Sequence, residues 1–456
     1  MSSLLGTMSI AMGALEAQQA GLQTTTNNIA NLNTPGYTRE RPVLQEANPI
    51  LQSGIAYGTG VKLCGIESLR DSILALQINN ETQQQGQSQA YVNAMSQAQT
   101  LFPDDTSGIG QAISTFFQSL NGLSTDPSNL ALRQSVLSAA NGMASAFNGA
   151  ANQLSAQRSS LDQNVEQDAG EVNQITQQIA GVNAKLAGLS NTSEGYGSFL
   201  DQRDDLVQKL SGLIDVSVIN DGTSITLTTK QGALLVADSQ SFALSTALDP
   251  ASGVQHVYSQ GSDITGNISG GALGGTLQAR DQTIPALQTQ LDTLAGGLVQ
   301  ALNTAHAQGF DLNGKQGGNL FTPVSGAGAA ASMAVAISDP TLLAASSDGS
   351  TGSNGNLANL SAVANQAVAS GMTPTQAYSN LVFQAGGAVS DATSELNASN
   401  TMLQQLQQQQ ASVSGVSLDE EASNLLLYQR AYQAAAQAIS TVDQMLQTAI
   451  QMGSGT

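Results

Sequence analysis

The sequence is poor in the residues that most metal and redox sites use. It contains one cysteine, Cys64, two histidines, His256 and His306, and no tryptophan among its 456 residues. A single cysteine excludes an intramolecular disulfide, and these three side chains do not make up the ligand set of a structural metal site. We therefore expect no metal ion and no cofactor, and a fold whose stability comes from packing.

Basic residues are scarce as well, 13 against 33 acidic ones, which gives a net charge of −20. This charge opposes binding to phosphate backbones and to anionic lipid headgroups, so neither nucleic acid nor a membrane is expected as a partner. No stretch approaches the roughly 20 uninterrupted apolar residues of a membrane span. No lysine or arginine precedes Arg39, so we expect no cleavable secretory signal.

Helical periodicity is the strongest positive signal. Near the start of the chain, large apolar residues recur at steps of three and four, interrupted only by Gln19 and Thr26, as on one face of a helix of roughly 25 residues. Asn33-Thr34-Pro35-Gly36-Tyr37 then predicts the end of this helix, because proline cannot continue its hydrogen-bond ladder. This first stripe consists of Leu5, Met8, Met12, Leu15, Leu22 and Ile29.

The last 40 residues show the same pattern. The second stripe is interrupted only by Glu421, and it consists of Leu418, Leu425, Tyr428, Tyr432, Ala435, Ile439, Val442, Leu446 and Ala449. Neither terminal helix can bury its stripe alone, and both are regular enough for coiled-coil packing. Periodicity by itself leaves two alternatives equally open, packing within one subunit and assembly between subunits.

The interior is also mainly helical. A third stripe runs through residues 130–189, with Arg133, Arg158 and Asp168 on it as expected kinks or exits from the core. Alternating apolar residues around Asn220-Asp221-Gly222 predict a hairpin, within a small β-rich element. Further helices are expected at 71–100, 111–122, 199–212, 283–307 and 376–412.

The fold class is therefore mainly α, with a coiled coil of the N- and C-terminal helices, a long-helix bundle and a small β-rich outer element. The expected domains are 1–40 with 416–456 as the assembly core, 41–213 with 271–415 as the helical domain, and 214–270 as the β-rich element. Within the helical domain, 309–360 is rich in Gly, Ala and Ser and is expected to be a poorly specified loop.

No motif predicts catalysis. Gly309–Lys315 spells G-x-x-x-x-G-K, but Gln316 replaces the magnesium-binding hydroxyl residue, and Asn313-Gly314 favours a simple turn. His306 closes a helix, where it is expected to bind backbone carbonyls. The clusters Asp201/Asp204/Asp205 and Asp419/Glu420/Glu421 are expected to cap helix N-termini, and the glycines at 270–275 to be a flexible entry to the next helix. We expect no enzyme.

Two end motifs resemble those of the flagellar rod, hook and hook-associated axial proteins. They are Asn27–Arg39, and Val416–Glu421 followed by Tyr428–Ala434. Three internal stretches are similar to the hook-associated protein 1 family: Leu200–Leu206, Gly274–Gln282 and Gln308–Gly314.

This resemblance implies a structural subunit at the hook–filament junction of the bacterial flagellum, exported by the flagellar type III apparatus and located outside the cell. Its implied partners are further copies in a helical axial array, the hook protein, the second hook-associated protein and a cytoplasmic export chaperone bound to the C-terminal region. The implied assembly interface consists of the two stripes, without Ala435 and Ala449, together with Asn31, Asn33, Pro35, Gly36 and Tyr37.

Two alternatives remain open. The chain could be another axial subunit, a hook or distal rod protein, which a mostly β interior would favour. It could instead be an enzyme or lytic factor carried on the axial scaffold, which would need a cleft lined by convergent polar residues within 214–360.

Overall fold

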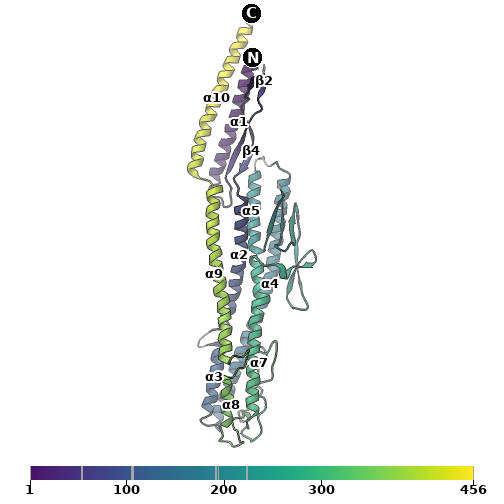
Figure 1. The fold of residues 1–456 in the computed structure, drawn as a ribbon, viewed down its shortest axis with the longest axis vertical. Helices are drawn as coiled ribbons and strands as arrows, with labels where there is room; N and C mark the ends of the chain where they lie inside the picture. Colours follow the sequence, from purple (N-terminus) through teal and green to yellow (C-terminus); the bar gives the residue numbers. More distant parts are fainter. Residues whose placement is uncertain are drawn as a thin grey trace.

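The computed structural model describes the chain except residues 1, 53–54, 104–106, 191–192, 194, 222–223 and 455–456. The molecule is elongated, with a pair of terminal helices at one end and a bundle of longer helices below it (Figure 1). Helix α1 (Ser2–Ala30) and helix α10 (Leu418–Ser454) lie side by side and run in opposite directions, so both termini lie at this end. Gly222 of the expected hairpin turn falls outside the described residues.

Two small hairpins follow α1 and were not anticipated from the sequence. Strand β1 (Glu40–Glu46) pairs antiparallel with β4 (Val61–Ser68), and β2 (Ile50–Gln52) pairs with β3 (Ile55–Tyr57). The start of the expected helical segment 41–213 is thus β-structure, and it packs on α1. The sequence of β1 shows little alternation of apolar and polar residues, because most side chains on both faces of this strand are exposed.

The bundle contains the helices that the periodicity predicts, and the mainly α fold class is confirmed. Their ends are set by local chemistry, since Asp71 and Asn129 cap α2 and α4, and Thr373 and Gln376 form a capping box at α9. The elements are α2 (Ser72–Gln99), α3 (Gly108–Leu123), α4 (Leu130–Ala187), α5 (Tyr196–Leu213), α6 (Gly271–Gln278), a π turn (Ala279–Thr283), α7 (Ile284–Ala307), α8 (Gly355–Ala362) and α9 (Pro374–Ser414).

Helix α4 runs unbroken for 58 residues, so Arg133, Arg158 and Asp168 do not interrupt it. Arg133 does not leave the core either, because its side chain is almost fully buried. Its guanidinium donates hydrogen bonds to the carbonyls of Pro127 (2.6 Å) and Leu343 (2.6 Å). A buried arginine here fastens a loop to the helix rather than interrupting the helix.

The segment 309–360 is irregular, as expected, but it is well packed rather than poorly specified. Leu320 and Phe321 are fully buried, and Phe321 packs edge-on against Phe116 of α3 with ring centroids 6.1 Å apart. Two short 3₁₀ turns, Pro340–Leu342 and Val363–Asn365, lie in and after it. Small residues dominate the segment because it is pressed between helices, not because it lacks a structure.

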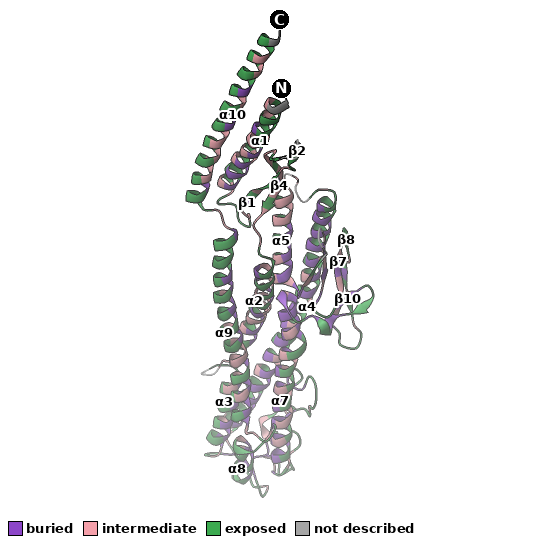
Figure 2. Cartoon of the chain, turned by 45° about the horizontal axis from the view of Figure 1, so that its top comes forward, coloured by how far each residue is buried: buried purple, intermediate pink, exposed green. Residues whose placement is uncertain are grey.

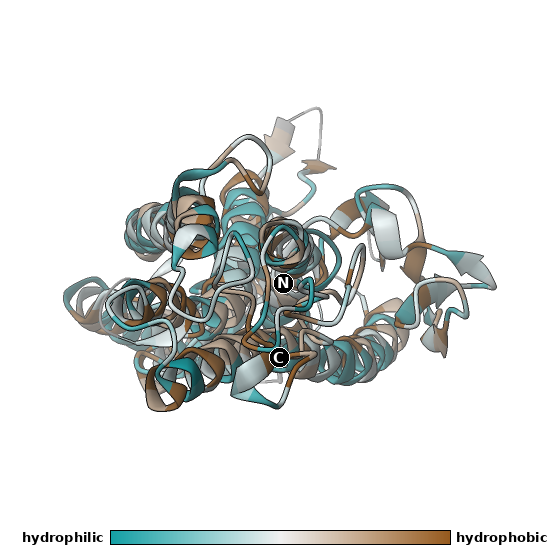
Figure 3. Ribbon diagram, turned by 90° about the horizontal axis from the view of Figure 1, so that it is seen from below, coloured by the Kyte–Doolittle hydropathy of each residue, from teal (hydrophilic) through white to brown (hydrophobic). Residues whose placement is uncertain are grey.

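The outer element packs on the second half of α4, and its strands project from the helical bundle when the molecule is seen along its long axis (Figure 3). Two sheets form it, with the orders β5–β6–β7–β8 and β11–β10–β9. The strands are β5 (Ser217–Asp221), β6 (Ser224–Thr228), β7 (Leu234–Ala237), β8 (Gln240–Ser241), β9 (Leu244–Leu248), β10 (Gln255–Ser259) and β11 (Ser262–Asp263), followed by a 3₁₀ turn (Thr265–Asn267).

The glycines at 270–275 are not a flexible entry, because most of them lie within α6 at points of close approach. A Cβ atom on Gly275 would lie 2.1 Å from the carbonyl oxygen of Gln87 in α2. Gly271 has φ +68° and touches the end of α5. These glycines let three helices pack backbone to backbone.

No described helix is long and apolar enough to span a membrane.

Asp168 gives a stability prediction. Burial raises the pKa of Asp168 to about 6, and the charge of Glu171 adds to the rise. A raised pKa means that the folded state is penalised when the carboxylate is ionised, above about pH 6. Asp168→Asn should therefore stabilise the protein at pH 7.5 by roughly 1 to 2 kcal/mol, a figure reduced for partial exposure.

The gain should shrink as the pH falls through 6 and vanish below about 4, where the carboxyl is protonated in both states. Thermal melts of the two proteins between pH 4 and 8 measure it. A constant difference in melting temperature over this range would contradict the assignment.

Candidate assembly site

The contact between α1 and α10, here called the terminal seam, is made of small and polar residues on the α1 side. Ala17 is fully buried, and a Cβ atom on Gly21 would lie 2.8 Å from the ring of Tyr428. The other buried residues of α1 are Ala11, Thr24, Thr25 and Asn28, on a helix that packs on β1 and β4 as well as on α10. Small side chains let the two helices approach closely, but they bury little apolar area.

The subunit covers the two predicted stripes only in part. On α10, Val442 is buried, Leu425, Tyr428, Tyr432, Ile439 and Leu446 are half-buried, and Leu418 is exposed. On α1, Leu5 and Met12 of the predicted stripe are 59% and 55% exposed, and Met8, Leu15, Leu22 and Ile29 are half-buried. Leu5 and Met12 are thus the α1 stripe residues that the subunit itself leaves largely uncovered.

Much of the terminal region exposes large apolar side chains. In Figure 2, exposed residues dominate α10, whereas α1 mixes exposed with half-buried and buried residues. None of the three buried apolar clusters of the described residues includes a side chain of α1 or α10. The exposed set on the helices is Leu5, Ile10, Met12, Leu418, Leu426, Leu427, Met445, Ile450 and Met452, and on the hairpins Val43, Leu44, Ile50, Leu51 and Tyr57. Such a concentration is typical of an interaction surface.

Below the seam, a polar joint ties the terminal helices together. Asn28 uses its whole side-chain amide there, accepting hydrogen bonds from the Tyr37 hydroxyl (2.8 Å) and the Glu40 N–H (3.0 Å). Its Nδ2 donates to the Glu40 carbonyl (2.9 Å) and to Glu421 Oε2 (3.2 Å). Burial raises the pKa of Tyr37, with the carboxylates of Glu40 and Asp201 adding to the rise, so its hydroxyl stays a donor.

Arg39 is the centre of the joint. Its Nε donates to Glu421 Oε1 (2.7 Å) and its Nη1 to Glu420 Oε2 (2.6 Å). Its backbone N–H donates to the carbonyl of Ser414 (2.9 Å) at the end of α9. One residue therefore connects the segment after α1 to the start of α10 and to the bundle, and the apparent gap in the α10 stripe at Glu421 is its buried partner.

A second ion cluster joins this segment to α5. The Thr38 N–H donates to Asp201 Oδ2 (3.1 Å), and Arg70 pairs with both Asp201 and Asp204. Burial raises the pKa of Asp201, and the charge of Arg70 opposes that rise. The N-terminal capping expected for Asp201/Asp204/Asp205 is wrong, since α5 begins at Tyr196 and has no acidic residue in its first turn. Asp419, Glu420 and Glu421 do lie in the first turn of α10.

The structure separates the motif residues after α1. Tyr37 belongs to the joint, and Asn31 bonds within its own turn, donating to the Asn27 carbonyl (3.0 Å). Asn33, Pro35 and Gly36 are exposed at the tip of the turn, where Gly36 has φ +77°. The sequence interpretation did not identify the residues that join the terminal helices to each other and to the bundle, which are Asn28, Arg39, Arg70, Asp201 and Glu421. The one signal in the sequence was the charge of Glu421 within an apolar stripe.

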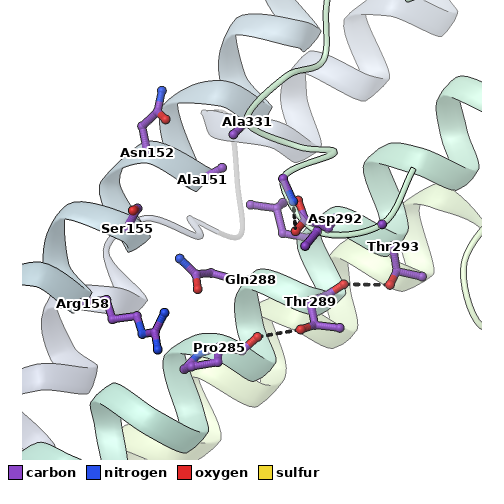
Figure 4. Close-up of a pocket in the computed structure, with 14 residues that line it drawn as sticks. Ala151, Asn152, Ser155, Arg158, Pro285, Gln288, Thr289, Asp292, Thr293 and Ala331 are labelled. Carbon is purple, nitrogen blue, oxygen red and sulfur yellow. Dashed lines mark hydrogen bonds between the residues drawn. The ribbon is translucent and has the colours of Figure 1, made fainter. Parts of the chain in front are cut away.

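Two polar clusters outside the terminal region contain carboxylates of the kind that acid–base chemistry uses. A pocket of about 540 Å³ lies between α4, α7 and residues 326–331. Figure 4 shows Arg158 reaching from α4 toward Pro285 and Gln288 of α7. The carboxylate of Asp292 is occupied by the N–H groups of Gly328 and Ala330, both at 2.8 Å. The pocket therefore offers no unoccupied carboxylate among its lining residues for acid or base chemistry.

The outer element contains Ser252, His256 and Asp263 in the hydrogen-bonding order of a hydrolase triad, which the sequence interpretation also missed. Ser252 Oγ lies 3.2 Å from His256 Nε2, and His256 Nδ1 lies 2.7 Å from Asp263 Oδ2. However, the Ser252 N–H donates to the Asp249 carboxylate and the Gly253 N–H to the Asp249 backbone carbonyl, and that carboxylate lies 3.8 Å from Nε2. A developing oxyanion would meet a negative charge instead of donors, so the geometry favours a fastened turn.

The polar joint gives a testable prediction. Glu421→Ala removes a buried carboxylate that serves Arg39 and Asn28, so it should cost about 3 kcal/mol of local stability. Hydrogen exchange should speed up in the first turns of α10 and the last turns of α1. The melting of the bundle should be nearly unchanged, because its apolar clusters do not include these residues.

Glu420→Ala is the matched control. Glu420 is the second carboxylate on Arg39, but its side chain is 60% exposed, so its loss should cost less than about 1 kcal/mol. Equal exchange rates in the two variants would show that burial does not strengthen the Glu421 contact.

Comparison with known proteins identifies three matching segments. Residues 95–321 match the flagellar hook-associated protein FlgK helical domain, residues 8–38 the flagella basal body rod protein family, and residues 407–452 the flagellar basal body rod FlgEFG protein C-terminal family. The last two segments contain α1 and α10.

Curated relatives named flagellar hook-associated protein 1 align with much of the chain. The Escherichia coli protein is 31% identical over 70% of this chain, and the Salmonella typhimurium protein 29% over 71%. The matched part spans about 60% of the length of these two relatives. The Bacillus subtilis protein is 27% identical over the full length of both chains.

The fold is shared with a solved structure, the flagellar hook junction protein FlgK from Burkholderia pseudomallei. The TM-score is 0.67 at 19% identity, over 74% of this chain and all of that one. Sequence relatives, domain models and fold agree, and the chain belongs to the flagellar hook-associated protein 1 family.

Proposed function

We propose that the chain is a structural subunit of the hook–filament junction, exported by the flagellar type III apparatus and polymerised outside the cell through its terminal helices. The observation that carries this proposal is the set of exposed large apolar side chains on α1 and α10, none of which belongs to a buried apolar cluster of the described residues. Burying one leucine or methionine side chain contributes roughly 1.5 to 3 kcal/mol, so several of them per copy can drive association.

The proposed interface includes the α1 stripe and the exposed residues Leu418, Leu426 and Leu427 of α10. Asn33, Pro35 and Gly36 are proposed to contact a neighbouring copy at the tip of their turn, whereas Tyr37 and Asn31 shape the joint that presents it. The α10 residues Leu425 to Leu446 act mainly through the terminal seam. The proposed partners are further copies of this chain, the hook protein, the second hook-associated protein and an export chaperone.

The alternative assignment, a hook or distal rod protein, is favoured less. Its expected sign was a mostly β interior, and the interior here consists of long helices with one small outer β-element. The family relatives are structural flagellar proteins, which supports a non-enzymatic role, as does the geometry around Ser252.

The function is tested in the parent bacterium with the gene deleted. Such cells should carry hooks without filaments and lose filament protein to the medium, and expression of the intact chain should restore filaments. Electron microscopy and immunoblots of the medium measure both effects. Filaments in normal number on the deletion strain would overturn the proposal.

The assembly surface is tested by placing a charge in it. The double change Leu426→Asp and Leu427→Asp should abolish incorporation into isolated hook–basal bodies, because two carboxylates would be desolvated at the contact. It should alter the melting of the monomer by less than about 0.5 kcal/mol, since both side chains are exposed.

Leu248→Asp is the matched control, an equally exposed leucine on the outer element. It should leave incorporation intact. Normal incorporation of the Leu426→Asp, Leu427→Asp variant would show that the outer face of α10 is not part of the assembly interface.

A further inference from the structure

Each terminal helix carries one isolated charge of particular interest. Glu16 is the single charged residue of α1, and Arg430 is the single basic residue of α10. Both side chains are exposed. Neither takes part in an ion pair or a side-chain hydrogen bond with another residue that the structure describes, whereas Arg39, Glu420 and Glu421 of the joint are paired.

Both charges lie among exposed apolar side chains, on faces turned away from the terminal seam. Met12 precedes Glu16 by one turn, and it is 55% exposed. Leu426 and Leu427 precede Arg430 by one turn and are 55% and 63% exposed. Any copy that covers these apolar residues must therefore also cover the charge beside them, at a cost unless the charge is paired.

The two charges lie at nearly the same height along the helix pair. Gly21 lies against Tyr428, and Asn28 bonds to Glu421, so the helices run antiparallel in step. Glu16 therefore lies about one turn from Arg430 along the axis, roughly 5 Å. A neighbouring copy shifted only slightly along the axis brings one charge against the other.

We propose that the outer face of α1 packs on the outer face of α10 of a second copy, with an ion pair between Glu16 and Arg430 of the two copies. This inference rests on the proposed function and adds the residues that select the arrangement. A two-fold contact between like faces would bring two Glu16 or two Arg430 side chains together, which is unfavourable. When unlike faces pair, each newly added copy uses one of its two outer faces and leaves the other free, so the array can continue to grow.

Charge reversal with mixing tests the pair. Glu16→Lys and Arg430→Glu are each expressed alone in the deletion strain, and then the two variants are expressed together. Incorporation is measured as the amount in hook–basal bodies relative to the amount in the medium, so that export is accounted for. Each variant alone should fall by roughly tenfold or more, because like charges meet at every contact.

Co-expression should recover incorporation, because copies of the two kinds can alternate with opposite charges at each contact. Glu166→Lys, the same charge change on α4, should incorporate like the unmodified chain. Absence of the unmodified chain from hook–basal bodies would instead refute the proposed function. Normal incorporation of the unmodified chain together with normal incorporation of both single variants, or with no recovery on mixing, would overturn the ion pair alone.

Discussion

The structure depends on a mismatch between two helices that must pack together. Helix α10 contributes leucine, tyrosine and valine side chains to the terminal seam, whereas α1 contributes alanine, glycine, threonine and asparagine. The buried residues of α1 are small or polar, so each of them adds little apolar area to this contact. Leu5 and Met12 of α1 are more than half exposed. We propose that further copies of the chain cover these exposed side chains.

A weakly stabilised pair must still be held in one orientation, and the polar joint provides this. Arg39, Asn28 and Glu421 satisfy one another and several backbone groups, in a region with few apolar contacts. Buried polar groups add little net stability, but their directional bonds accept few alternative geometries. Arg70 and Asp201 extend the same network to the bundle. This network thereby holds the exposed helices α1 and α10 on the helical bundle, which is stabilised separately.

The bundle uses polar side chains of helices to order the irregular segment 309–360. Asn303 donates to the Phe321 carbonyl (2.8 Å) and accepts from its N–H (2.9 Å). His306 contacts the Gly318 carbonyl (2.7 Å) through Nδ1 and accepts from the Ala344 N–H (2.9 Å) through Nε2. Burial lowers the pKa of His306, which keeps Nε2 available as an acceptor. Loop backbone without ladder partners is satisfied in this way.

The sequence by itself determined the helices, the stop at Asn33–Tyr37 and the mainly α class, because periodicity and turn chemistry are local properties. Only the tertiary structure decided which face of each helix is covered. Leu5 and Met12 have the pattern of a buried stripe, yet the seam uses Ala17 and Gly21, since periodicity records an apolar face without naming its partner. Likewise, the sequence alone presents Glu421 as an interruption of an apolar stripe and the glycines of α6 as a flexible segment. The structure shows that Glu421 pairs with Arg39 and that the glycines allow the backbone of α2 to approach closely.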